Sequence, residues 1–208
     1  MPHRAKNGYR RRVARPPLSD RRKAQTRLEI AASALELFVR DGYDAVRAEA
    51  IAAEAGVSLR TFYRYFPAKD EVLSPIVTRG TETLAARFAA RPPDETVAEA
   101  FAAAFREMGG PQAGARYATE LIRLLTDVPV LRARWLADLR TIESAFSMVV
   151  KQRTPTPLND ADAELTGAIL ATALRIALER ASSEDATGGE PAILLDEILA
   201  RLAAGGGL

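Results

Sequence analysis

A short basic and aromatic segment, residues 58–66, holds the side chains of this sequence that are best suited to contact nucleic acid. Arg60 carries a planar guanidinium that can donate two hydrogen bonds to the edge of a guanine in the major groove. Leu59 and Thr61 beside it can contact the methyl group of a thymine. These three residues are therefore predicted to read base edges.

Contacts to the phosphate backbone are predicted around the same segment. The phenols of Tyr63 and Tyr65 and the ammonium of Lys69 can donate hydrogen bonds to phosphate oxygens, and so can Arg47, which precedes the segment. Such contacts fix the position of a protein on a duplex without reading its sequence.

The residue types that enzymes use for catalysis are scarce. The chain has no cysteine and one histidine, His3. A thiolate metal site and a cysteine nucleophile are thereby excluded, and a zinc site or a catalytic triad lacks its usual ligand or base. Gly109-Gly110-Pro111 breaks a helix and is not a phosphate-binding loop. We expect no enzymatic activity, no metal and no cofactor.

The charge of the chain is unevenly distributed. Residues 1–69 carry 15 Lys and Arg against 7 Asp and Glu, whereas residues 70–208 carry 14 against 20. A basic first third on an acidic remainder indicates a polyanionic partner for the first third only. Residues 1–18 are expected to form a disordered basic arm. This arm either tracks phosphates beside the candidate DNA-reading surface or serves as a solvated tail.

Three helices are predicted to position the contact residues. The first begins near Ser19-Asp20, both good N-caps, and ends at Gly42. The second covers about 47–55, and Gly56 allows the chain to turn. The third begins at Ser58, whose hydroxyl can cap it, and Pro67 ends it. Val57, Phe62 and Phe66 are predicted to face inward and hold this helix-turn-helix together.

The rest of the chain is also predicted to be helical, so the fold class is all-α. Proline and glycine breaks separate the expected helices, and no convincing strand alternation is present. No apolar run approaches the ~20 residues needed to cross a bilayer, and a cytoplasmic protein without membrane contact is expected. The helices are expected at about 69–90, 94–108, 113–126, 129–152, 160–183 and 190–204.

A helical hairpin with a basic solvated face is the alternative reading of this pattern, and it would make the chain an interaction module that binds protein. The segment 51–73, IAAEAGVSLRTFYRYFPAKDEVL, favours DNA because it resembles the N-terminal signature of the TetR/AcrR family. The match covers about Thr26 to Leu73 and includes Ala34, Phe38, Gly42 and Tyr43.

The resemblance implies a homodimer whose subunits have a helix-turn-helix domain at 19–68 and a ligand-binding and dimerisation domain at 69–208. Members of the family usually repress transcription from a palindromic operator and are released by a small molecule. Tyr65 stands where many members have histidine, and its phenol can still donate to phosphate. Carried over residue by residue, the family's DNA contacts fall on Arg47, Ser58, Leu59, Arg60, Thr61, Tyr63, Tyr65 and Lys69.

Residues 172–208 loosely resemble the end of a subgroup with an acyl-CoA-like ligand domain, the grouping that includes the mycofactocin-system regulator. An acyl-CoA or another apolar effector is therefore expected. Large side chains at helical spacing in this half can line a cavity for it, or they can be ordinary core. The candidates for the cavity are Phe88, Phe101, Phe105, Met108, Arg116, Leu121, Leu125, Trp135, Leu139 and Phe146.

The last two predicted helices have more apolar surface than one subunit needs to bury. A four-helix interface between two copies of the chain is therefore predicted, with burial inside the monomer as the alternative. The candidates for the interface are Ala168, Thr172, Ile176, Leu195, Ile198, Leu199 and Leu202.

Overall fold

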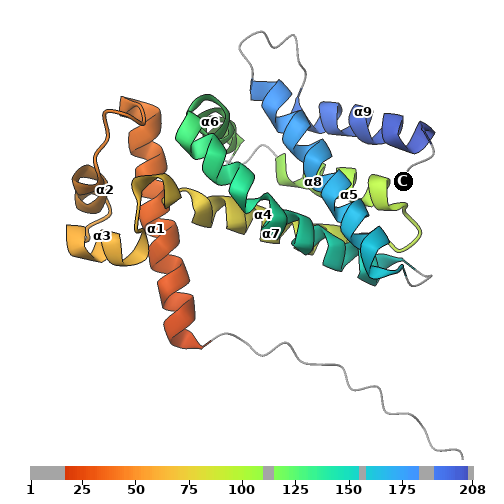
Figure 1. Ribbon diagram of the computed structural model, residues 1–208, viewed down its shortest axis with the longest axis horizontal. Coiled ribbons are helices and arrows are strands. Elements are labelled where there is room, and N and C mark those ends of the chain that lie inside the picture. The colour runs from red at the N-terminus through yellow and green to blue at the C-terminus, as the bar shows by residue number, and fades with distance from the viewer. Residues whose placement is uncertain (1–16, 110–114, 155–157, 183–189, 206–208) are drawn as a thin grey trace, which may run out of the picture.

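The computed structural model describes residues 17–109, 115–154, 158–182 and 190–205, except for the side chains of residues 109 and 115–117. The described residues form helices and no strand, which confirms the all-α class. Helices α1 to α3 gather at one end of the molecule, and α4 leads from them into a bundle formed by the later helices (Figure 1). The elements are α1 Leu18–Asp41, α2 Ala48–Glu54, α3 Leu59–Tyr65, η1 Lys69–Glu71, α4 Ser74–Ala90, α5 Val97–Arg106, η2 Glu107–Gly109, α6 Ala115–Asp127, α7 Pro129–Arg153, α8 Asp160–Ser182 and α9 Pro191–Ala204.

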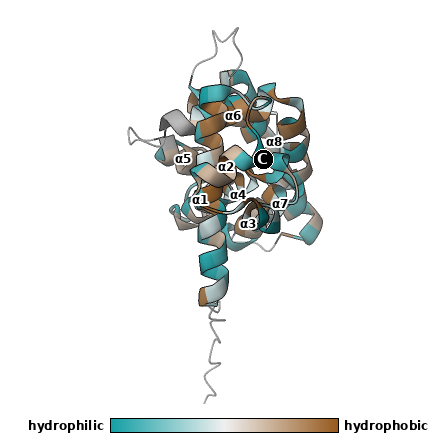
Figure 2. Ribbon diagram, turned by 90° about the vertical axis from the view of Figure 1, so that its left-hand side faces the viewer, coloured by the Kyte–Doolittle hydropathy of each residue, from teal (hydrophilic) through white to brown (hydrophobic). Residues whose placement is uncertain are grey.

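Helix α1 begins earlier than expected. Pro17 occupies the N-cap position, no side chain caps the helix, and the Ser19 hydroxyl lies 3.5 Å from the Asp20 carboxylate instead. The prediction of a cap by Ser19 or Asp20 was therefore wrong. The first turns of α1 project below the rest of the molecule and are mostly hydrophilic (Figure 2). The predicted arm, residues 1–18, lies almost wholly outside the described residues.

The predicted helix over 69–90 is divided in the structure. A 3₁₀ turn, η1, comes first, and α4 begins only at Ser74, with Pro75 in its first turn. Proline has no backbone N–H to donate to the carbonyl of Glu71, so an α-helix cannot continue through it but can begin there. Helix α5 likewise begins at Val97 and not at residue 94. Thr96 and Glu99 form a reciprocal capping box that sets this start.

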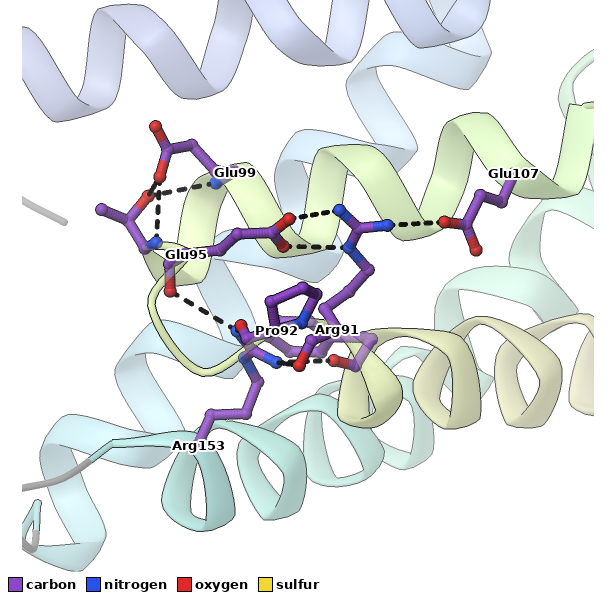
Figure 3. Close-up of polar contacts among 8 residues, drawn as sticks. Arg91, Pro92, Glu95, Glu99, Glu107 and Arg153 are labelled. Atoms are coloured by element: carbon purple, nitrogen blue, oxygen red, sulfur yellow. Dashed lines mark hydrogen bonds and ion pairs between the residues drawn. The ribbon is translucent and has the colours of Figure 1, made fainter.

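The corner between α4 and α5 is fastened by arginines (Figure 3). Arg153, in the last turn of α7, donates to the carbonyls of Phe88 at 3.1 Å and Arg91 at 2.8 Å. It thereby adds a side-chain donor at the C-terminal end of α4, where the Phe88 carbonyl also accepts the Arg91 backbone N–H at 3.3 Å. Arg91 pairs with Glu95 and, at 2.6 Å, with Glu107. Hydrogen bonding to Arg91 lowers the pKa of Glu95. This end of α4 is therefore tied to both α5 and α7.

Three aromatic rings form the centre of the bundle. Phe101 lies edge-on to Phe88 at 5.4 Å and to Phe146 at 4.9 Å between ring centroids. All three rings are completely buried, and such edge-to-face pairs stabilise beyond the area they bury. They join α4, α5 and α7 into one core.

Helices α7 and α8 approach each other closely at Gly167. A Cβ added at this position would lie 2.2 Å from the Ser147 hydroxyl oxygen and 2.7 Å from the Glu143 carbonyl oxygen. The backbone carbonyl cannot move aside without displacing α7, so only glycine fits here.

We predict that Gly167→Ala destabilises the fold by about 1–3 kcal/mol, because it overpacks this crossing. The free energy of unfolding from urea titration measures the effect. Gly80→Ala is the matched control: it also lies within a helix, but an added Cβ meets nothing within 4 Å. Removing its backbone freedom is expected to stabilise by about 0.5–1 kcal/mol. Equal effects of the two substitutions would contradict the close approach.

Candidate nucleic-acid interface and cavity

Helix α3 is held at its start by Ser58. The Ser58 hydroxyl accepts a hydrogen bond from the Thr61 backbone N–H at 3.1 Å and donates to the Thr61 hydroxyl at 3.0 Å. The predicted cap is thus confirmed, and the Ser58 proton is used inside the motif. The Thr61 hydroxyl accepts from Ser58, so its own proton remains available to an acceptor outside the protein.

The inward face of α3 locks it against its neighbours. Phe62 and Phe66 are completely buried, with ring centroids 5.7 Å apart, and Val57 is half-buried. Gly56 adopts a φ of 66°, which lets the chain turn, and the Val57 N–H closes the turn on the Ala52 carbonyl at 2.9 Å. The predicted inward set is therefore confirmed.

The outward face of α3 carries the predicted contact residues. Ser58, Leu59, Arg60 and Tyr63 are exposed, and Tyr63 retains 49% of its accessible surface. Arg47, the N-cap residue of α2, is exposed as well. Thr61 and Tyr65 are half-buried. A face of this kind presents a guanidinium, phenols and a hydroxyl to the solvent at the position where a recognition helix meets DNA.

Lys69 occupies a different setting from that expected for a phosphate contact. Its ammonium donates to the carbonyls of Tyr43 at 2.8 Å and Val46 at 3.0 Å, and it lies 3.8 Å from the centre of the Tyr43 ring. Burial lowers the pKa of Lys69, while the Asp44 carboxylate acts in the opposite direction. Two of its three donors thus fasten the loop that leads to α2. The predicted phosphate contact would have to use the third donor of this ammonium.

Arg27 is a basic residue near α3 that the sequence pattern did not single out. Its guanidinium lies over the Phe66 ring, 4.9 Å from the centroid, and so brings α1 against the end of the helix-turn-helix. The contact joins residues far apart in the chain, and helical spacing therefore carries no signal of it.

A partly open cavity of about 690 Å³ lies between α4 and the later helices. Its wall is mostly apolar, and its volume lies within the range of small-molecule sites. Among the predicted lining residues, those that lie in its wall are Phe105, Met108, Leu121, Leu125, Trp135 and Leu139.

Three predicted lining residues are misassigned. Phe88, Phe101 and Phe146 are absent from the wall because they stack on one another in the core. The side chain of Arg116, the fourth remaining candidate, lies outside the described residues.

Several wall residues were missed by the sequence reasoning. Ile76, Val77 and Gly80 come from α4, and their small or aliphatic side chains gave no signal distinct from ordinary core. Charged residues also border the cavity. Arg106 pairs with Asp196 through contacts of 2.7 and 2.6 Å that connect α5 to α9.

The predicted interface residues divide into two groups. Leu195 and Leu199 are 0% and 2% exposed, so they pack inside the subunit and cannot meet a second copy; these two assignments were wrong. Thr172 and Leu202 are exposed. The other three candidates are half-buried: Ala168, Ile176 and Ile198. Leu165 of α8 and Ile193 of α9 are large apolar side chains, 62% and 52% exposed, that the prediction did not include.

Comparisons with known proteins agree with this architecture. Residues 30–75 match the family model of bacterial regulatory proteins of the tetR family, and residues 91–207 match the MftR C-terminal domain. The HTH-type transcriptional regulator TcmR of Streptomyces glaucescens is 30% identical over 154 residues, which are 70% of this chain and 67% of TcmR. EthR of Mycolicibacterium smegmatis, also an HTH-type regulator, is 26% identical over 199 residues, 92% of this chain and 87% of EthR.

A solved structure is similar to this chain in fold over both the helix-turn-helix half and the bundle. The Thermus thermophilus repressor FadR, crystallised with lauroyl-CoA, superposes with a TM-score of 0.55 at 27% identity, over 88% of this chain and 95% of FadR. None of these relatives favours a helical module that binds protein without reading DNA. Nor is any of them an enzyme. This chain belongs to the TetR family of bacterial regulatory proteins and is a DNA-binding transcriptional regulator.

Proposed function

We propose that the chain represses transcription as a homodimer that binds a palindromic operator and leaves it when an apolar or acyl-type effector fills the cavity. The observation that carries this proposal is the cavity itself, because its wall includes Ile76, Val77 and Gly80 of the helix that leads directly from the helix-turn-helix. An effector held there touches the element that positions the DNA-contacting half.

The DNA contacts follow from the exposed face of α3. Arg60 and Thr61 are assigned to base edges, and Leu59 to a thymine methyl. Ser58 caps the helix and presents its turn to the duplex. The residues assigned to the phosphate backbone are Arg47, Tyr63, Tyr65 and Lys69.

A second copy of the chain is proposed to cover the exposed apolar side chains of α8 and α9. Leu165 and Leu202 are 62% and 38% exposed, and Ile193, which also lines the cavity, is 52% exposed. Exposed apolar patches commonly mark an interface between proteins. A two-fold dimer would set two α3 helices about 34–36 Å apart, the spacing of successive major grooves, and so require a palindromic site.

The effector is proposed to have an apolar chain and a polar head. The chain would lie along Leu121, Trp135 and Leu139, while the Arg106–Asp196 pair at the wall would meet the head group. The lauroyl-CoA bound by the FadR repressor of Thermus thermophilus has this character and supports the choice of probe.

We predict that Arg60→Ala and Arg47→Ala affect DNA binding in different ways. Duplexes selected from a random pool by the wild-type protein provide the operator. Arg60→Ala should weaken binding by about 1–3 kcal/mol and relax the preference at one base pair, because it removes a base contact. Arg47→Ala should weaken binding to all sequences alike and reduce the slope of log affinity against log salt by about one, because it removes a phosphate contact.

Exposed Arg140 of α7 supplies the control, and Arg140→Ala should change neither the base preference nor the salt dependence. Unchanged selectivity in Arg60→Ala would contradict its assignment.

We predict that lauroyl-CoA changes the fluorescence of Trp135, the single tryptophan of the chain, because this residue lies in the cavity wall. Gly80→Phe should lower the affinity by roughly tenfold, because a side chain added at Gly80 meets no protein atom within 4 Å of its Cβ and enters the cavity. The unfolding temperature checks that the variant folds. Lauric acid and dodecanol, measured in parallel, separate the contribution of the head group from that of the chain. Lauroyl-CoA binding unaffected by Gly80→Phe would place the ligand elsewhere.

A further inference from the structure

A small polar network joins the helix-turn-helix half to the bundle at the start of α4. Arg134 of α7 lies 3.5 Å from the carboxylate of Glu71 in η1 and 3.7 Å from that of Asp138, one turn further along α7. The Ser74 hydroxyl, at the first position of α4, donates to Asp138 at 3.2 Å. Glu71, Ser74, Arg134 and Asp138 are called the joint below.

Arg134 is shared between the two carboxylates and saturates neither. Charge-assisted hydrogen bonds of arginine to carboxylate are usually about 2.7–2.9 Å long, and both contacts here are longer. The Arg134 Nε is buried and has no hydrogen-bond partner among the described residues. A buried donor without a partner is costly, so closing onto either carboxylate would stabilise the side chain. Arg134 thus bridges the two carboxylates through different nitrogens, Nη1 toward Glu71 and Nε toward Asp138, and a short movement can tighten either contact.

The joint lies directly behind the cavity wall. Trp135 and Leu139 follow Arg134 and Asp138 on α7 by one residue each, and both line the cavity. On the other side, Ile76 and Val77 line it two and three residues after Ser74. A ligand between these residues would contact α4 and α7 at the place where the joint connects them.

The opposite end of α4 is held in place. Arg153 holds the carbonyls of Phe88 and Arg91, and Arg91 is held in turn by Glu95 and Glu107 (Figure 3). A helix fixed at its C-terminal end and pushed near its N-terminal end turns about the fixed end. The largest displacement then falls at Ser74 and η1, where Glu71 meets Arg134.

We propose that Arg134 is the positioning residue that reports occupancy of the cavity to the DNA-binding half. In the empty protein it holds Glu71 and keeps the helix-turn-helix in place against α7. When a ligand separates α4 from α7, Arg134 leaves Glu71 and closes onto Asp138, and η1 is released. This inference rests on the proposed function for its regulatory meaning, while the exchange of partners is a property of the chain alone.

Two isosteric substitutions should act in opposite directions. Glu71→Gln removes the charge that holds η1, so the ligand-free protein should bind the selected operator about fivefold more weakly. Asp138→Asn removes the competing carboxylate but can still accept from Ser74, so the loss of operator affinity caused by lauroyl-CoA should shrink about fivefold. Because the exchange of partners is linked to ligand binding, Trp135 fluorescence should give a tighter lauroyl-CoA affinity in Glu71→Gln and a weaker one in Asp138→Asn. If Arg134 had only a structural role, both substitutions would change the operator affinity in the same direction.

Arg132→Gln is the matched control. Arg132 also lies on α7 and also makes an ion pair of 3.5 Å, with Glu179 of α8, but it has no contact with η1. It should behave as the wild type in every assay.

A distance measurement tests the joint without operator or effector. Because the chain has no cysteine, cysteines introduced at exposed Glu54 of α2 and Arg140 of α7 take spin labels at those sites alone. Dilution with unlabelled subunits removes distances between two chains, so that only the distance within one chain is measured.

Glu71→Gln should broaden or shift the distribution of this distance, whereas Asp138→Asn and Arg132→Gln should leave it narrow. An unchanged distribution in Glu71→Gln overturns the proposal. Failure of the wild type to select any duplex would instead refute the proposed function and leave this result standing.

Discussion

Helix α4 belongs to two packed systems at once, and the rest of the molecule depends on this constraint. Its buried Leu84 and Phe88 lie in the common core, it contacts α1, and its first turns form part of the cavity wall. A helix of 17 residues is about 25 Å long and moves as a rod. One element, α4, therefore contacts both the cavity and the DNA-contacting half.

The helix-turn-helix satisfies its own backbone and core from within. Ser58 caps α3, and buried Phe62 and Phe66 pack it against the core. Lys69 fastens the loop before α2 with two hydrogen bonds to carbonyls. Exposed Arg60 and Tyr63 lie on the outward face, although the Tyr63 ring also packs edge-on to Phe62, 5.4 Å between ring centroids.

Local signals in the sequence predicted most of this fold. Ser58, Gly56 and Pro67 have short-range effects on backbone geometry, and the helices they delimit were correctly placed. The division of residues 69–90 was missed because the helical period continues across Pro75. The cavity was only partly predicted: Phe101 and Trp135 have similar size and helical spacing, and only the packing of α4, α5 and α7 decides that one stacks in the core and the other lines the wall. Contacts such as Arg134 with Glu71 depend on the tertiary fold and leave no pattern.

The most direct test of the account is thermodynamic reciprocity between the two sites. The affinity for lauroyl-CoA, followed by Trp135 fluorescence, is measured with and without saturating operator, and the affinity for operator with and without saturating lauroyl-CoA. If one element couples the sites, each ligand must weaken the other by the same factor, expected to be about 5- to 150-fold. Equal lauroyl-CoA affinities in the presence and absence of operator would show that the cavity and the DNA-contacting surface act independently.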